Sequence, residues 1–221
     1  MINGMTSALV SGASRGIGRA ISLALAGRGV RLCLVGRSED ALRAAAEECR
    51  EHGADAEILS GDLTDRRFLD GVGKSAEERI GPVDILINNS GVIEGNSIDQ
   101  VSDEQWEKVI SVNVTGMFKC IREGFKYMKS RGGKIINIGS IAGETPRMFS
   151  SPYTTSKHAV RGLTKSAALD GRELGISVSC LNPGNTKVDR RADGRSGSGR
   201  DEGPEILIEA NDIAKIGRAH V

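Results

Sequence analysis

The chain has 221 residues, of which 38% are hydrophobic and 27% are charged, a balance typical of a soluble globular protein with a substantial core. Its formal net charge is +1 and its basic residues are scattered, so neither nucleic acid nor a membrane is an expected partner. No run of about 18 apolar residues predicts a membrane span, and residues 1–9 lack the features of a secretory signal. We therefore expect a cytoplasmic protein.

The cysteines also fit a reducing compartment. They lie far apart in the sequence, and no two form a Cys-x-x-Cys pair. Cys33 and Cys180 fall inside apolar runs, where a thiol behaves as a small hydrophobic side chain. This spacing predicts neither a disulfide framework nor a metal site.

Short apolar runs alternate with longer amphipathic stretches along the chain. In chain order we predict a strand at 8–10, a helix at 17–26, a strand at 31–35, a helix at 38–52, a strand at 56–59, a helix at 65–79, a strand at 83–87, a helix at 102–130, a strand at 134–138, a helix at 151–174 and a strand at 176–181. The strands are rich in Val, Ile and Leu without polar alternation, as expected where both faces are covered. The fold class is therefore α/β, a single domain with a Rossmann-type, doubly wound parallel sheet that binds its ligand at the carboxyl ends of the strands.

A glycine-rich turn follows the first predicted strand directly. It reads Ser11-Gly12-Ala13-Ser14-Arg15-Gly16-Ile17-Gly18 and leads into the first predicted helix. The three glycines allow a tight turn and a close backbone approach to a pyrophosphate, whose charge then lies at the helix N-terminus. We predict that the cofactor-binding residues here are Gly12, Ser14, Arg15, Gly16, Ile17 and Gly18.

Several further motifs keep the order and spacing of one family. Residues 11–18 resemble the T-G-x-x-x-G-x-G signature of the short-chain dehydrogenase/reductase family, with Ser in place of Thr, and residues 88–91 resemble its N-N-A-G element. Asn113, Ser140 and the segment 153–157 match its catalytic positions. The resemblance runs from about residue 6 to residue 186 and implies hydride transfer between a nicotinamide cofactor and a carbonyl or alcohol.

The end of the second predicted strand bears on the choice of cofactor. NAD sites usually place an acidic residue about 20 positions after the glycine turn, where it bonds the adenosine ribose. Here Arg37 occupies that place, and its guanidinium can donate two hydrogen bonds to a 2′-phosphate. Arg15 can approach the same phosphate from the other side. We therefore predict NADP(H) rather than NAD(H), the alternative being that both arginines are solvated surface residues.

The resemblance implies the remaining cofactor contacts. The adenine ring would be held after the third strand, the ribose and nicotinamide wall after the fourth, and the carboxamide after the sixth. The residues are Asp62, Leu63, Asn89, Gly91, Pro183, Gly184 and Thr186. Asp62 has an alternative role as the cap of the helix that begins near Thr64.

Tyr153 and Lys157 lie four positions apart in a predicted helix, so both side chains project from one face. Carbonyl reduction needs a proton donor at the oxygen as hydride reaches the carbon, and a nearby ammonium favours the ionised form of a phenol. Ser140 follows a predicted strand and would hydrogen-bond the substrate oxygen, with capping of a turn as its alternative. We predict Ser140, Tyr153 and Lys157 as catalytic residues, the last two also holding the cofactor.

Asn113 lies inside the apolar run 109–118, where a buried amide is costly unless it is hydrogen-bonded. The resemblance assigns it a catalytic role, that of holding a water which links Lys157 to bulk solvent, and a structural kink in the helix is the alternative. His158 is expected to face away from the substrate, because successive helical side chains project about 100° apart. Trp106 and Phe118 fit a buried or subunit-contacting helix face.

Two segments are expected to shape the substrate pocket. Residues 144–152 contribute Met148 and Phe149, which suggest an apolar component. The loop after Thr186 is polar and glycine-rich over residues 185–203, so it is either a functional lid or disordered.

The C-terminal end departs from the family pattern. Members continue to a seventh strand, whereas here a helix-like stretch at 205–215 is followed by IGRAHV at 216–221. This hexapeptide resembles a translated sequencing adapter. We hypothesise that 216–221 is a non-native read-through tail, that the domain comprises residues 1–215, and that the final strand is missing. For the full-length form the resemblance implies a homo-oligomer, either a dimer or a tetramer.

The sequence thus predicts an NADP(H)-dependent oxidoreductase for a small carbonyl or secondary alcohol substrate, with a tyrosine as general acid and base. The alternative from another class is a non-catalytic NADP(H)-binding regulatory or scaffold protein. The joint presence of Asn113, Ser140, Tyr153 and Lys157 argues against that alternative, because a pure binder does not need all four.

Overall fold

A computed structural model describes residues 6–187 and 208–219 of the chain, with side chains up to residue 215. Its strands are β1 (Ser7–Ser11), β2 (Arg31–Gly36), β3 (Ala56–Ser60), β4 (Ile85–Asn88), β5 (Gly133–Ile138), β6 (Ile176–Leu181), β7 (Thr186–Lys187) and β8 (Ile208–Glu209). Its helices are α1 (Gly16–Ala26), α2 (Glu39–Glu51), α3 (Arg66–Ile80), α4 (Asp103–Ile110), α5 (Met117–Met128), α6 (Ser151–Asp170) and α7 (Ala210–Ala219). All six strands predicted from the apolar runs are present.

The six long strands form one parallel sheet in the order β3-β2-β1-β4-β5-β6. The order reverses between β1 and β4, and ligands of doubly wound sheets bind at such a switch point, outside the carboxyl ends of the strands. The predicted fold class is confirmed. Within the described part of the chain, β6 is the last strand of this sheet, and β7 pairs only with β8.

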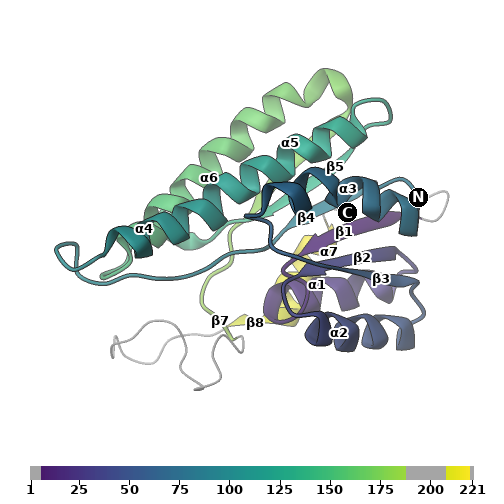
Figure 1. Cartoon of the computed structure of the whole chain (residues 1–221), viewed down its shortest axis with the longest axis horizontal. Coiled ribbons are helices and arrows are strands. Elements are labelled where there is room, and N and C mark those ends of the chain that lie inside the picture. Colours follow the sequence, from purple (N-terminus) through teal and green to yellow (C-terminus); the bar gives the residue numbers. More distant parts are fainter. Residues whose placement is uncertain (1–5, 188–207, 220–221) are drawn as a thin grey trace.

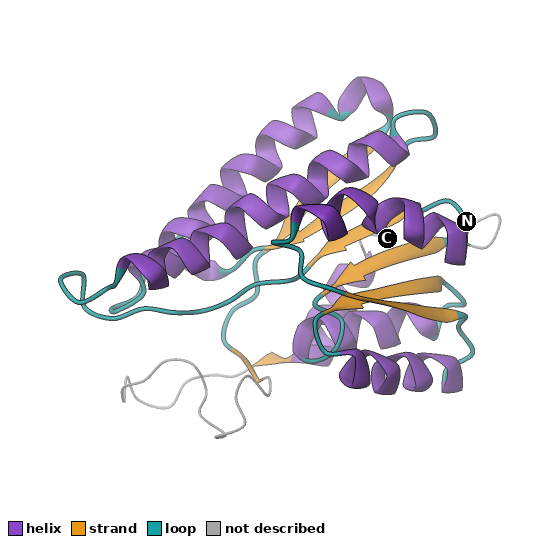
Figure 2. Ribbon diagram, in the orientation of Figure 1, coloured by secondary structure: helices purple, strands orange, loops and turns teal. Residues whose placement is uncertain are grey.

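Helices cover both faces of the sheet (Figures 1 and 2). On one face α1, α2 and α7 enclose an apolar cluster that includes Leu25, Leu32 and Leu42. On the other face α3, α5 and α6 enclose a second cluster that includes Val35, Met128 and Ile135. Both faces of the strands are therefore buried, which explains the absence of polar alternation in their sequences. Figure 1 also shows α4 and the start of α6 projecting past the carboxyl edge of the sheet.

The long helix predicted at 102–130 contains an irregularity that the sequence pattern does not reveal. After α4 the backbone forms a π-helical turn, Ser111–Gly116, and then continues as α5. Such turns are rare and occur frequently at functional sites. The turn contains Asn113, for which a structural role in the helix was the alternative prediction.

The C-terminal helix begins later than the sequence suggested. A helix was expected from residue 205, and α7 starts at Ala210 and packs against α1. The helix runs across residue 215, where we placed the end of the domain. This domain boundary stays a prediction, and so does the origin of residues 216–221. The loop predicted as a lid or as disordered lies mostly outside the described residues, which end at 187 and resume at 208.

The cysteines are free thiols, three of them buried. Burial raises the pKa of the Cys33 and Cys120 thiols to about 12 and that of Cys49 to about 11. These side chains therefore remain protonated and act as small apolar groups. Across residues 6–187 and 208–219, no helix has both the length and the apolar character needed to cross a membrane.

Candidate active site

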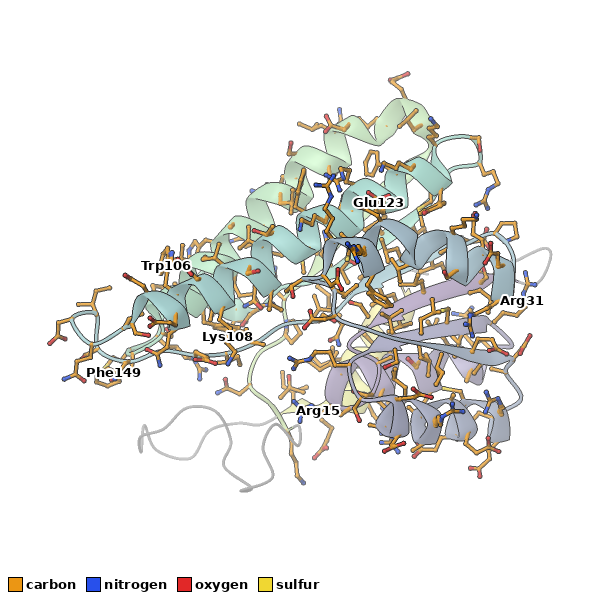
Figure 3. All side chains as sticks on the ribbon, in the orientation of Figure 1. Arg15, Arg31, Trp106, Lys108, Glu123 and Phe149 are labelled. Atoms are coloured by element: carbon orange, nitrogen blue, oxygen red, sulfur yellow. The ribbon has the colours of Figure 1, made fainter. Side chains whose placement is uncertain are left out.

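A cleft of about 740 Å³ opens at the carboxyl ends of the central strands. Figure 3 shows that its lining comes from distant parts of the chain, with Arg15 at the start of α1 and Lys108 on α4. Sixteen of the eighteen predicted site residues line it, namely Gly12, Ser14, Arg15, Gly16, Ile17, Arg37, Asp62, Leu63, Asn89, Gly91, Ser140, Tyr153, Lys157, Pro183, Gly184 and Thr186. The other two, Gly18 and Asn113, are buried behind its wall.

The glycine turn is fixed to the neighbouring strand by a small hydrogen-bond network. The Asn89 amide donates to the backbone carbonyls of Ser11 and Gly12, both at 3.1 Å. In return, the Ser11 hydroxyl accepts from the backbone N–H groups of Asn89 and Ser90, at 3.0 and 3.1 Å. Gly12 and Gly16 adopt φ angles of +63° and +56°, in the left-handed region that favours glycine. The hydroxyl of Ser11 can thus accept both hydrogen bonds, although the family signature has a threonine at this position.

Gly18 acts by packing rather than by lining the cleft. A Cβ atom at this position would lie 2.3 Å from the Gly12 carbonyl oxygen and 2.5 Å from the Asn89 amide nitrogen. The first turn of α1 can therefore approach the glycine turn only because residue 18 has no side chain. This close approach sets the direction in which the helix N-terminus points.

Gly18→Ala is expected to destabilise the fold by about 1–3 kcal/mol, the usual cost of forcing extra atoms into a packed site. The matched control is Gly71→Ala in the interior of α3, where an added Cβ would meet no atom within 4 Å. That control should stabilise the protein by about 0.5–1 kcal/mol, because alanine loses less entropy in a helix. Denaturant unfolding measures both, and a Gly18→Ala protein as stable as the wild type would contradict the packing role.

Two arginines and one carboxylate line the cleft beside the carboxyl ends of β1, β2 and β3. Arg15 and Arg37 are both exposed. The pKa of the Asp62 carboxyl lies below its usual range, because Thr64 donates to it through its backbone N–H and its hydroxyl, each at 2.8 Å, and because the Arg37 guanidinium is close. The N-cap of α3 is Asp65, so capping that helix is not the role of Asp62.

Glu39, the carboxylate nearest to Arg37 in the sequence, pairs with another arginine in the described structure. Glu39 accepts from the Arg43 side chain, with Nε at 3.1 Å, one turn along α2. Ser38 caps the same helix by accepting from the backbone N–H of Ala41 at 3.4 Å. The carboxylate nearest in sequence therefore belongs to the helix surface, and the cation faces the cleft.

Of the residues predicted to react, Ser140 lies on the turn after β5, and Tyr153 and Lys157 lie on α6. Lys157 is 5% exposed, and its ammonium donates to the Ile138 carbonyl at 2.8 Å. The same nitrogen lies 5.6 Å from the centre of the Tyr153 ring. The structure therefore places a buried cation beside the phenol of Tyr153.

Ser140 combines both roles considered for it. Its hydroxyl accepts from the backbone N–H of Ala142 at 3.1 Å and so caps the short 3₁₀ turn Ile141–Gly143. A hydroxyl accepts and donates at the same time, so its proton is free to point into the cleft that the residue lines. The capping bond fixes the position of the Ser140 oxygen and does not use the hydroxyl proton.

The residues after β6 lie beside this turn. The backbone N–H of Ile141 donates to the Pro183 carbonyl at 3.0 Å, and the Thr186 hydroxyl donates to the Gly184 carbonyl at 3.0 Å. Segments some 40 positions apart in the chain are thus held on the same wall of the cleft. Their contact with a carboxamide stays a prediction.

Asn113 does not reach the cleft surface, although the resemblance gives it a part in proton transfer. It is 1% exposed, and its side-chain amide makes three hydrogen bonds within the protein. These bonds support a structural role, and the holding of a water stays a prediction.

Three other expectations concern residues near the site. His158 is exposed, and its ring contacts the Thr154 carbonyl at 3.0 Å, away from the cleft lining, as expected. Trp106 and Phe118 are 41% and 46% exposed, so they are not buried, and a subunit contact stays a prediction.

Met148 and Phe149 do not line the main cleft. Phe149 borders a separate hollow of about 290 Å³, and Met148 is 71% exposed. Phe149 adopts a φ of +58°, and its carbonyl packs so closely on Gly95 that a Cβ there would lie 2.0 Å away.

Sequence reasoning missed part of the lining. Lys108 forms an ion pair with Glu94, and both residues line the cleft together with Gln105. Met117 and Cys120 line it as well. Helical periodicity placed these residues on a helix but could not show which face turns towards the sheet edge.

The comparison with protein families agrees with this geometry. Residues 6–198 match the sequence model of the family described as short chain dehydrogenase. The chain belongs to the short-chain dehydrogenase family. The cleft, the glycine turn and the Tyr153–Lys157 pair are the features that the sequence motifs of this family predicted.

Relatives of this short-chain dehydrogenase are named for different substrates. A 3beta-hydroxysteroid dehydrogenase of Mediterraneibacter gnavus is 34% identical over 179 residues, which cover 80% of this chain and 65% of that protein. A 3-oxoacyl-(acyl-carrier-protein) reductase of Staphylococcus aureus is 35% identical over 180 residues, covering 80% of this chain and 73% of that protein. The chain thus spans less than two thirds of the steroid dehydrogenase's length.

Solved structures show the same architecture. A variant of actinorhodin polyketide ketoreductase, solved with NADPH, superposes with a TM-score of 0.91 at 29% identity, covering 97% of this chain and 89% of that one. Acetoin dehydrogenase of Salmonella typhimurium superposes with a TM-score of 0.86 at 30% identity, covering 98% of this chain and 88% of that one. The described fold is therefore the one on which these enzymes are built.

Proposed function

We propose that this short-chain dehydrogenase is an NADP(H)-dependent oxidoreductase that interconverts a carbonyl and a secondary alcohol. One observation carries the proposal. Ser140, Tyr153 and Lys157 line the same cleft as a glycine turn at the N-terminus of α1, where a pyrophosphate is favoured. A protein that only binds the cofactor does not need Ser140, Tyr153 and Lys157 together in its cleft.

The cleft suits a dinucleotide in shape and charge. Its volume of about 740 Å³ lies in the usual range of cofactor sites. Gly12, Gly16 and the start of α1 offer backbone to the pyrophosphate, while Arg15 and Arg37 provide cations for a 2′-phosphate. Asp62 and Leu63 would border the adenine ring, and the segment 183–186 the carboxamide. The relative solved with NADPH supports the same choice of cofactor.

In carbonyl reduction, three residues of the chain would each have a separate role. NADPH, when bound in the cleft, would supply a hydride for the carbonyl carbon. Tyr153 donates its hydroxyl proton to the carbonyl oxygen as negative charge develops there, and it takes the proton back in the oxidation direction. Lys157 stabilises the phenolate that remains, and Ser140 donates a hydrogen bond to the same oxygen.

A carbonyl panel tests the proposal directly. The purified protein would be mixed with NADPH or NADH and with ketones of several classes, including a steroid and a 3-oxoacyl thioester, and loss of the reduced cofactor would be followed. We expect turnover with at least one class and a higher kcat/KM for NADPH than for NADH. Tight binding of NADPH without turnover across the panel would contradict the proposal.

The location and assembly proposed for the protein rest on composition and resemblance. The net charge of +1 supports a small-molecule substrate rather than nucleic acid, and we place the enzyme in the cytoplasm as a homo-oligomer. Light scattering of the purified chain would show its assembly state.

A further inference from the structure

Ser156 is a fully buried hydroxyl to which the proposed reaction assigns no role. It lies in α6 between Tyr153 and Lys157 and has 0% exposure. It does not line the cleft, so it does not meet the substrate or the cofactor. A hydroxyl in such a place is costly unless its hydrogen bonds are made.

Both hydrogen bonds of this hydroxyl connect parts of the active site. Ser156 Oγ donates to the backbone carbonyl of Tyr153 at 2.7 Å. It accepts from the Asn113 side-chain nitrogen at 3.0 Å, a contact between two residues that are 43 positions apart. Serine side chains in helices commonly bond to a backbone carbonyl of their own helix. The bond from Asn113 is different, because it joins α6 to another part of the chain.

Asn113 in turn holds the loop after β4. Its Nδ2 donates to the Val92 carbonyl at 2.9 Å, and its Oδ1 accepts from the Val92 N–H at 2.8 Å. Val92 lines the cleft. A continuous chain of hydrogen bonds therefore runs from the cleft wall at Val92 through Asn113 and Ser156 to the backbone of Tyr153.

The π-helical turn explains how Asn113 reaches both partners. The turn Ser111–Gly116 inserts an extra residue into the helix between α4 and α5 and so changes the direction of the side chains that follow. Asn113 lies within it and points towards both α6 and the loop after β4.

We propose that Ser156 is a positioning residue, which fixes the turn of α6 that carries Tyr153 and Lys157 against Asn113 and thereby sets the place of the phenol in the cleft. The proposal rests on the proposed function, because it assigns Tyr153 the proton transfer. Its physical basis is that displacements of about 1 Å can cost about 100-fold in rate. Without the hydroxyl, the Asn113 N–H loses an acceptor in a buried site and this turn of α6 loses its tie to the adjacent helix.

The test compares Ser156→Ala with Ser166→Ala, which makes the same change at an exposed position of the same helix. For each protein the NADPH-binding sites are counted by fluorescence titration, and kcat is expressed per binding site. We expect Ser156→Ala to lower kcat about 10–100-fold and to move the midpoint of the oxidative pH profile upwards. The midpoint moves because the ammonium then stabilises the phenolate less well. Ser166→Ala should match the wild type in both.

Ser156→Cys provides a second variant in case Ser156→Ala does not fold. Its thiol fills nearly the same space but is a weak donor and acceptor, so kcat per site should again fall about tenfold or more. In an Asn113→Ala background, Ser156→Ala should have a smaller effect than in the wild type, because the two residues act through one contact.

The outcomes separate this inference from the proposed function. A wild-type protein with no turnover of any carbonyl overturns both. A wild-type enzyme whose Ser156→Ala and Ser156→Cys variants keep the wild-type kcat per site and pH midpoint, and only melt earlier, overturns the positioning role and leaves the proposed function intact.

Discussion

Replacement of Tyr153 by phenylalanine is expected to lower kcat by about 10²–10⁴-fold, the usual contribution of a positioned proton donor. The substitution removes one oxygen atom and keeps the ring that packs near the Lys157 ammonium, 5.6 Å from its centre. The affinity for NADPH should therefore stay close to that of the wild type. Steady-state kinetics give the first quantity, and fluorescence titration of NADPH gives the second.

The chain supplies a matched control in its other tyrosine. Tyr127 lies on α5 and packs against Gly73 of α3, and burial raises the pKa of its hydroxyl. It does not line the cleft. Tyr127→Phe makes the same chemical change and should leave kcat unaltered. If Tyr153→Phe also keeps the wild-type kcat, Tyr153 is not the proton donor and the mechanism fails.

The fold could be predicted from sequence because each of its determinants is local. A buried parallel strand needs an unbroken apolar run, and the runs at 31–35 and 176–181 coincide with β2 and β6 to within one residue. The site followed from one topological rule, since motifs placed directly after parallel strands must meet at one edge of the sheet. This rule brought Gly12, Ser140 and Arg37 to one cleft from three different strands.

The sequence did not show which residues line the cleft and which support it from behind. Gly18 and Asn113 belong to motifs, yet the structure buries both. For Gly18 the decisive fact is the 2.3 Å distance from a notional Cβ to the Gly12 oxygen, which depends on the packing of α1. For Asn113 it is a π-helical turn within the long helix predicted at 102–130, and the apolar pattern of that stretch did not reveal it.

Two smaller differences have the same origin. Asp62 and Asp65 both precede α3, and only the backbone geometry decides that Asp65 caps the helix while Asp62 binds Thr64. Met148 and Phe149 appeared to be pocket residues because they are apolar and near Tyr153 in sequence. The structure instead places Phe149 at a separate hollow and leaves Met148 exposed.

Removal of the Arg37 side chain is expected to have the second largest effect, on cofactor choice. Arg37→Ala should raise the KM for NADPH about 10–100-fold, because a hydrogen bond to a charged group contributes about 1.5–3 kcal/mol. The KM for NADH should change little, since that cofactor has no 2′-phosphate. Arg37→Asp should go further and lower the KM for NADH, because a carboxylate at the end of the second strand can accept from the free 2′-hydroxyl.

Arg43→Ala separates a direct contact from a general loss of positive charge. Arg43 lies on α2, pairs with Glu39 and is absent from the cleft lining, yet its removal changes the net charge by the same amount. A long-range field would be screened over about 10 Å at moderate ionic strength and would weaken NADPH binding similarly in both variants. A direct phosphate contact predicts a rise in KM only for Arg37→Ala. Equal kinetics of Arg37→Ala and the wild type with NADPH would instead assign Arg37 to the solvated surface and leave the choice of cofactor to Arg15.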